Sequence, residues 1–185
     1  MTRIRGAVLG AALVAVAVIG VNVLPSSAHK KPPPVASEPP PVASEPEPIA
    51  VEPLTGRAVF TDDVDLKLKV KVEGGKRVVV KAKDPSRTFV ARFTLQPGAQ
   101  FPWHTHPGPV IVNVTQGELV YVDAEDCVER SYPAGTAFVD TGHGHVHTAY
   151  NPTDAPTVLV GTFFEAPPAP APVLIPVDAP DDCEV

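Results

Sequence analysis

Basic residues are scarce in this sequence. Lysine and arginine together number 15 against 21 aspartate and glutamate residues, so the formal net charge is −6 at pH 7. Nucleic acids and anionic membrane surfaces repel a protein of net negative charge, which argues against both as partners. The chain has 185 residues and a hydrophobic content of 44%. We therefore expect it to bury a core and to form one folded domain.

No cysteine lies near the end of the apolar N-terminal segment, which argues against a lipid-modified N-terminus. That segment is typical of an export signal. Arg3 and Arg5 precede an uncharged run at residues 6–24, and residues 26–28 are small enough for cleavage. We expect residues 1–28 to be a signal peptide and the protein to be secreted or associated with the cell envelope. The run is nearly long enough to span a bilayer, so an uncleaved N-terminal anchor is the alternative and the only membrane contact that we expect.

The chain has only two cysteines, Cys127 and Cys183. An even number in an oxidising compartment favours a disulfide bond. This bond would tie the C-terminal tail to the folded domain. By restricting the unfolded chain, it would stabilise the folded state by about 4 kcal/mol. Two free thiols or a metal ligand are the alternative, which is less common outside the cytosol.

Proline, in contrast, is abundant, with 24 residues. Much of it falls in residues 29–53, where the heptapeptide Pro-Pro-Val-Ala-Ser-Glu-Pro at 33–39 recurs at 40–46. Such a segment lacks backbone donors and samples extended polyproline II conformations. We expect a disordered Pro-rich linker that acts as a stalk. A ligand for a Pro-recognising domain is the alternative.

The sequence shows no helical periodicity after the first 28 residues. Apolar and lysine residues alternate at 66–72, a Gly-rich turn occupies 73–76, and a second alternating run follows, which predicts a hairpin with one solvated face. Further strands are expected at 88–95, 110–115, 118–122, 136–140, 145–151 and 157–164. Short strands at this spacing predict an all-β sandwich or barrel over residues 54–166, followed by a Pro/Ala-rich acidic tail at 167–185.

Histidine is concentrated in the middle of the chain, where five of the six histidines lie between residues 104 and 147. His104 and His106 are two apart, so on a strand both imidazoles lie on one face. His143, His145 and His147 form a second alternating set, which points one way if that strand is regular. Two such strands facing each other would bring three imidazoles to one divalent metal, since neutral imidazole is a common ligand for transition metals.

These residues resemble the motifs of the cupin family. The first cupin motif, Gly-x5-His-x-His-x3-Glu-x6-Gly, is met by Gly98, His104, His106 and Gly117. The end of the second, His-x3-Asn, is met by His147 and Asn151. The resemblance covers residues 88–165. It implies a double-stranded β-helix, also called a jelly-roll barrel, which often forms a homodimer, and a metal held by His104, His106 and His147.

The sequence departs from the first motif at Val110, which occupies the position of the family's glutamate. Without that carboxylate the ligand set is three neutral imidazoles, which favours Fe, Ni, Cu or Zn over Mn. His145 is a candidate fourth ligand. The alternative is that metal binding has been lost and the histidines are hydrogen-bonded in the barrel mouth.

Other side chains are candidates for supporting roles. Phe101 and Trp103 could form an apolar wall for a small ligand together with Val110 and Tyr150, although aromatic residues there are often plain core. Asp140 and Tyr150 could orient a ligand histidine.

Three functions fit these observations. The first is an exported module that binds a divalent metal and a small molecule in the barrel. The second is a metal-dependent oxidoreductase, similar to three-His cupin dioxygenases, acting on a small substrate. The third is a structural envelope domain with a vestigial site. The missing glutamate removes an obvious general base and favours binding over catalysis.

Overall fold

The computed structural model describes residues 47–71, 76–83, 85–183 and 185. The predicted export segment, residues 29–46 of the predicted linker and most of the expected hairpin turn lie outside these residues. The described residues contain strands and no helix, which confirms the all-β prediction. Accordingly, no helix in this part of the chain is long and apolar enough to cross a bilayer.

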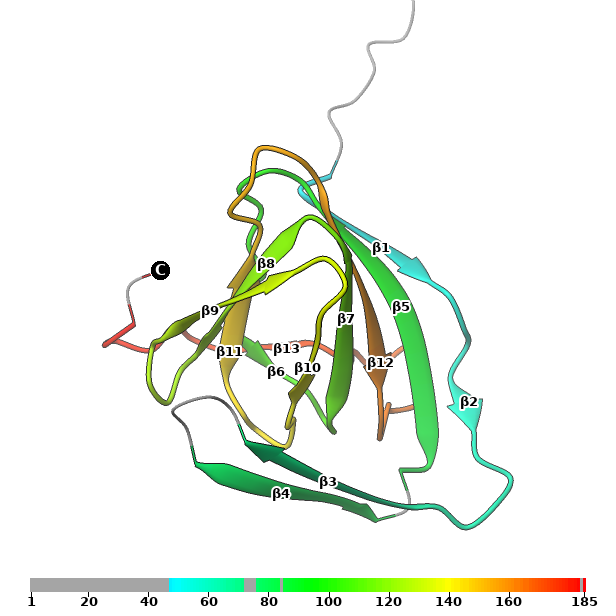
Figure 1. The fold of residues 1–185 in the computed structure, drawn as a ribbon. Coiled ribbons are helices and arrows are strands. Elements are labelled where there is room, and N and C mark those ends of the chain that lie inside the picture. Colours follow the sequence, from blue (N-terminus) through cyan, green and yellow to red (C-terminus); the bar gives the residue numbers. More distant parts are fainter. Residues whose placement is uncertain (1–46, 72–75, 84, 184) are drawn as a thin grey trace, which may run out of the picture. The chain divides into compact units, whose positions relative to one another are not determined.

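Two antiparallel sheets face each other and form the barrel (Figure 1). The first sheet has the order β1 (Ile49–Pro53), β5 (Arg87–Leu95), β12 (Thr157–Phe163), β7 (Val110–Gln116) and β10 (Ala137–Asp140), with β2 (Ala58–Val59) also pairing with β5. The second has the order β13 (Ile175–Pro176), β6 (His104–Thr105), β11 (His147–Tyr150), β8 (Glu118–Asp123) and β9 (Glu129–Pro133). This is the double-stranded β-helix that the sequence predicted.

A separate two-stranded sheet lies between β2 and β5 in the chain. It pairs β3 (Asp65–Lys71) with β4 (Arg77–Lys83) over seven residues on each strand. Along β3 the lysines are exposed and the alternating Leu66, Leu68 and Val70 are half-buried. The predicted hairpin with one solvated face is therefore confirmed.

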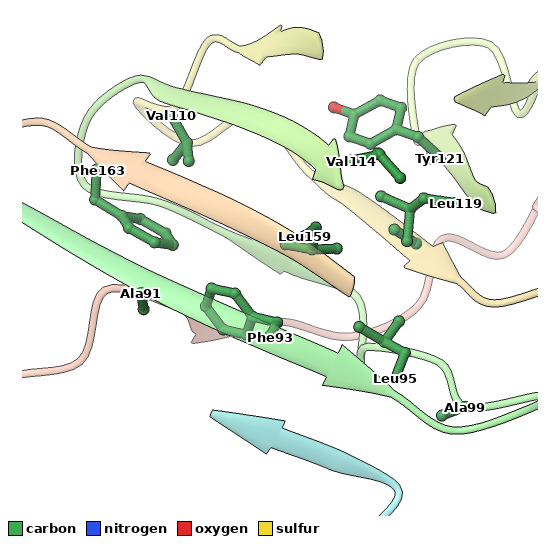
Figure 2. Close-up of a cluster of buried hydrophobic side chains, with 11 residues drawn as sticks. Ala91, Phe93, Leu95, Ala99, Val110, Val114, Leu119, Tyr121, Leu159 and Phe163 are labelled. Carbon is green, nitrogen blue, oxygen red and sulfur yellow. The ribbon is translucent and has the colours of Figure 1, made fainter. Parts of the chain in front are cut away.

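The barrel core consists of alternate side chains from strands of both sheets. Figure 2 shows Ala91, Phe93 and Leu95 of β5 with Leu159 and Phe163 of β12, and these five residues are at most 7% exposed. The intervening residues of each strand face away, as the two-residue period of a strand requires. Burial of these apolar side chains is the main term that stabilises the barrel.

The prediction was wrong at the end of the linker. Ile49–Pro53 form β1, which pairs with β5 from Ile49 opposite Leu95 to Pro53 opposite Ala91. The Pro-rich sequence around it suggested a linker, yet β1 is an edge strand, and its single proline, Pro53, is tolerated because one side of an edge strand makes no ladder hydrogen bonds. Strands β6, β9 and β13 were also not anticipated.

The backbone conformation explains why the first motif has glycine at two of its positions. Gly98 and Gly117 adopt φ of 70° and 72°, the left-handed region that favours glycine. At Gly117 a Cβ would also lie 2.6 Å from Oγ1 of Thr157. These turns therefore set where β7 ends and β8 begins, and where the chain enters the segment that carries His104.

Candidate metal centre

Two adjacent strands and the residue after one of them bring three histidines together inside the barrel. His104 of β6 is directly opposite His147 of β11 in the antiparallel ladder, and His106 lies two residues beyond His104. The ring centroids are 4.2 Å apart for His104 and His147, 4.8 Å for His104 and His106, and 5.1 Å for His106 and His147. All three side chains are buried. One ligand nitrogen from each lies within 4.8 Å of those of the other two.

The hydrogen bonds of these rings assign their tautomers. Nδ1 of His104 lies 2.7 Å from the carbonyl oxygen of Pro102, and Nδ1 of His106 lies 2.7 Å from that of Val173. A carbonyl only accepts, so both Nδ1 atoms carry the proton and both Nε2 atoms keep a lone pair. Nδ1 of His147 lies 3.2 Å from Oδ2 of Asp140, although the contact is not aligned as a hydrogen bond. The hydrogen bonds therefore assign the tautomers of His104 and His106, and His147 faces a carboxylate without a hydrogen bond to it.

Burial keeps the three imidazoles neutral. It lowers the pKa of His104 to about 3, with a further contribution from the neighbouring His147 and His106. It lowers the pKa of His147 to about 4 against the opposing effect of Asp140, and it lowers the pKa of His106 as well. Neutral imidazoles with free lone pairs are the form that binds a metal, so the residues present fit a divalent transition ion.

Asp140, at the end of β10, links this group to a second polar cluster. It is 1% exposed. Its Oδ2 accepts hydrogen bonds from Tyr121 at 3.0 Å and from Nδ1 of His145 at 2.9 Å, and its Oδ1 accepts one from the backbone of Gly142. Burial raises the pKa of Asp140, but the hydrogen bond from His145 and the nearby His147 and His106 outweigh it and lower the pKa. The group of three imidazoles thus contains no carboxylate, but the carboxylate of Asp140 lies directly behind His147.

His145 does not lie where a fourth metal ligand would, because it sits between two carboxylates. Its Nδ1 contacts Asp140 and its Nε2 lies 2.8 Å from Oδ2 of Asp123. Burial acts in the opposite direction, but the two carboxylates raise the pKa of His145 to about 10. His145 is therefore an imidazolium between two carboxylates, and neither nitrogen offers a lone pair.

The strand expected at residues 145–151 is shorter in the structure, where β11 spans His147–Tyr150, and the condition that His143, His145 and His147 share one regular strand is not met. Gly142, His143 and Gly144 adopt φ of 60°, 55° and 88°, so the chain turns before β11 begins at His147. The alternation of the three histidines is lost as a result. His143 contacts Glu165 instead of joining the centre.

A small cavity of about 50 Å³ adjoins the three histidines. Space for one water needs roughly 10–15 Å³ on this measure, so the cavity has room for an ion with a few small molecules of solvent or a compact ligand. Its walls are mainly apolar and include Phe101, Val110, Tyr121 and Leu174. Phe101 and Val110 are thus wall residues of this cavity.

Trp103 and Tyr150, the other expected wall residues, do not line this cavity. They belong to a second cluster with Val120, Val122 and Cys183, and Tyr150 donates a hydrogen bond to Glu129. The reason is the period of the strands. Trp103 is next to His104 and Tyr150 is three residues after His147, so both point to the opposite face.

Tyr121 and Asp123 of β8 were not singled out from the sequence. The ring of Tyr121 stacks on His147 at a centroid distance of 5.0 Å and an interplanar angle of 26°. Alternation with the buried Leu119 would have placed Tyr121 and Asp123 on the inner face of their strand, but it gives no hint of their histidine partners. Asn151 of the second motif is buried and donates to the carbonyl oxygens of Leu95, Gln96 and Ala155. It holds the turn after β11.

The predicted disulfide is confirmed, since Cys127 and Cys183 are bonded across a sequence separation of 56 residues. Cys183 is buried beside Trp103. The bond joins the C-terminal tail to the loop that follows β8.

Comparison with known proteins gives a family but no curated relative. The family model described as a cupin domain matches residues 91–163, which span β5 to β12 and include the three histidines. No curated protein matches the chain.

Many solved structures resemble the chain. A double-stranded β-helix protein from Klebsiella pneumoniae is 25% identical, with coverage of 40% of this chain and 64% of that one and a TM-score of 0.37. A cupin-superfamily sugar phosphate isomerase from Silicibacter pomeroyi is 32% identical over 42% and 50%, with a TM-score of 0.37. A cupin-like protein from Thermotoga maritima is 29% identical over 42% and 57%, with a TM-score of 0.39. This chain spans less than two thirds of the length of each of these three proteins.

Proposed function

Because this chain belongs to the cupin superfamily, we propose that it is an exported binding protein that holds one divalent transition metal through His104, His106 and His147. The observation that carries the proposal is the tautomer pattern. Nδ1 of His104 and Nδ1 of His106 donate to the carbonyl oxygens of Pro102 and Val173, which leaves both Nε2 atoms with a lone pair beside the neutral ring of His147.

The donor set points to a borderline metal. Three imidazoles suit Fe(II), Ni(II), Cu(II) or Zn(II), whereas Mn(II) and Mg(II) prefer oxygen ligands. The ion would be accessible from the cavity, whose apolar wall favours a compact ligand with a single polar group that reaches the metal. When bound, the metal would act as a Lewis acid toward that group.

A calorimetric titration of metal-free full-length protein with Zn(II), Ni(II), Co(II) and Mn(II) tests the proposal. We expect one site per chain and weaker binding of Mn(II) than of the other three. Single His104→Gln, His106→Gln and His147→Gln variants should each weaken binding strongly. If all three variants bound the metals as tightly as the unaltered chain, the assignment would be refuted. That result would support a structural domain with a vestigial site.

Turnover of a small substrate is the second candidate, in which the protein is a dioxygenase-like oxidoreductase. Its support is the apolar wall beside three imidazoles, since exclusion of water favours metal-dependent chemistry. Asp140 and Tyr121 are engaged with each other, and Tyr121 has a pKa raised by burial, so neither is a ready general base. Oxygen uptake by Fe(II)-loaded protein with small phenols, thiols or diketones, abolished in His104→Gln, would establish catalysis.

Export and the stalk remain part of this proposal. The N-terminal sequence of the protein from its natural compartment distinguishes a cleaved signal from an anchor. A chain that begins after residue 28 supports cleavage, whereas an intact N-terminus in the membrane fraction supports anchoring.

A further inference from the structure

The C-terminal tail runs alongside the strand that carries the metal-site histidines. In β13, Ile175 pairs with Thr105 and Pro176 pairs with His104 (Figure 1). The backbone N–H of Val177 then donates to the carbonyl oxygen of Trp103 at 2.9 Å. The tail is therefore the edge strand of the second sheet at the position of the proposed metal centre.

Two consecutive residues of this tail contact the centre. The carbonyl oxygen of Val173 accepts the hydrogen bond from Nδ1 of His106, and Leu174 lines the cavity. Ile175, one residue further, points outward and is 41% exposed. The tail thus supplies both the group that fixes the tautomer of one histidine and part of the cavity wall.

The tail is held at both ends, but weakly in between. Before it, Arg57 donates a hydrogen bond to the carbonyl oxygen of Ala171 at 3.1 Å. After it, Cys183 is bonded to Cys127. The strand itself is only two residues long. A short terminal segment with so few ladder bonds frays unless it is tied down, and the disulfide ties it.

We propose that residues 173–183 are a strap that completes the metal centre and that the Cys127–Cys183 bond keeps it in place. The strap is a positioning element. The Val173 carbonyl orients His106 so that its Nε2 faces the site, and Leu174 limits access of solvent to the ion. This inference rests on the proposed metal binding and adds to it that the site depends on a segment outside the matched cupin region.

The direct test compares metal binding by three forms of the chain: the full chain, the Cys127→Ser/Cys183→Ser variant, and a chain ending at Pro172. Loss of a partner that orients a metal-binding histidine weakens affinity by about 10- to 100-fold. We expect a loss of this size for Zn(II) in the chain ending at Pro172 and a smaller loss, by about 3- to 10-fold, in the double serine variant, where the strap is present but untied. Far-UV circular dichroism of the metal-free forms checks that each is folded.

A spectroscopic readout separates positioning from general destabilisation. Electron paramagnetic resonance of Cu(II)-loaded protein reports how many nitrogens bind the ion. We expect three in the full chain and two in the chain ending at Pro172, because His106 loses its orientation.

A matched pair of point variants tests the cavity wall within an intact strap. Leu174→Ala should release Zn(II) to a chelator at least about threefold faster, because the apolar shell controls solvent access, whereas Ile175→Ala should release it at the rate of the unaltered chain. Equal rates in the two variants would overturn the role of Leu174.

The outcomes distinguish this inference from the proposed function. If the folded chain ending at Pro172 binds Zn(II) as tightly as the full chain, with three nitrogens on Cu(II), the strap is not part of the centre. If the full chain itself binds no metal, the proposed function fails instead.

Discussion

Oδ2 of Asp140 lies 3.2 Å from Nδ1 of His147, and both side chains are buried. Asp140 therefore holds a negative charge directly behind an imidazole of the proposed metal centre. A carboxylate in this position fixes the orientation of a ligand histidine and makes it more basic. The cupin motif has a negatively charged glutamate at the position of Val110. Asp140 partly replaces that negative charge.

Replacing Asp140 by asparagine should weaken metal binding without changing its stoichiometry. We expect about 10- to 100-fold lower affinity for Zn(II), because His147 loses its charged partner. The free energy of unfolding of the metal-free protein should fall by about 3 kcal/mol, because the charge of His145 loses one of its two buried partners. Calorimetry and urea unfolding measure the two effects. The exposed Asp154→Asn is the control, and an equal response of the two variants would contradict the role of Asp140.

Restoring the missing glutamate should shift the metal preference. Val110 is 1% exposed and lines the cavity, so Val110→Glu buries a carboxylate beside the histidines. We expect the metal-free variant to unfold at a lower temperature, because an unpaired buried charge is costly, and Mn(II) to bind at least about tenfold more tightly. Val110→Gln is the control, because glutamine has nearly the same size as glutamate but no charge. The account would be wrong if glutamine improved Mn(II) binding as much as glutamate.

The first half of the centre was predictable from sequence because it depends only on the period of a strand. His104 and His106 are two apart and share a face, and the same parity places Trp103 on the other face. Parity applied to Trp103 and Tyr150 would have removed both from the cavity wall.

The second half depended on backbone turns that residue spacing does not reveal. His147 could be separated from His145 only through its spacing to Asn151, since the left-handed turn at residues 142–144 breaks the alternation. The pairing of His145 with Asp123 and Asp140 joins three strands and their loops, and no local pattern encodes it. Strand β1 was hidden because it ends a Pro-rich segment, and the contact of Val173 with His106 spans 67 residues of sequence.

The different roles of His145 and His147 give a third prediction. His147→Gln should weaken metal binding strongly, because it removes one of the three nitrogens that hold the ion. His145→Gln should keep one site per chain with affinity reduced by about tenfold, because it only disturbs the orientation of Asp140. Calorimetric titrations of both variants measure this difference. Loss of the site in His145→Gln, with binding retained in His147→Gln, would exchange the two assignments.

The stability of the metal-free protein should be greatest near pH 6.5. Below that pH the unfolded chain protonates its histidines, while folded His147 stays neutral to about pH 4 and folded His104 to about pH 3. Protons then bind preferentially to the unfolded state, and the free energy of unfolding falls by about 1.4 kcal/mol per pH unit for each such histidine. Acid should therefore destabilise the protein steeply.

The alkaline side of this profile has a different cause. The pKa of folded His145 is raised to about 10, so its stabilising contribution is complete below about pH 6.5 and is lost as the pH rises toward 10. Urea unfolding in the presence of a chelator, at pH values from 4 to 10, measures both sides. His145→Gln should flatten only the alkaline side. An unchanged alkaline side in this variant would contradict the assignment of an imidazolium.

The metal content of the protein from its natural compartment tests the central claim most directly. Elemental analysis should find one Fe, Ni, Cu or Zn ion per chain in the unaltered protein. It should find none in a folded variant with His104, His106 and His147 all replaced by glutamine. A metal-free natural protein that also fails to bind any of these ions on titration, or a triple variant that retains its ion, would contradict the account.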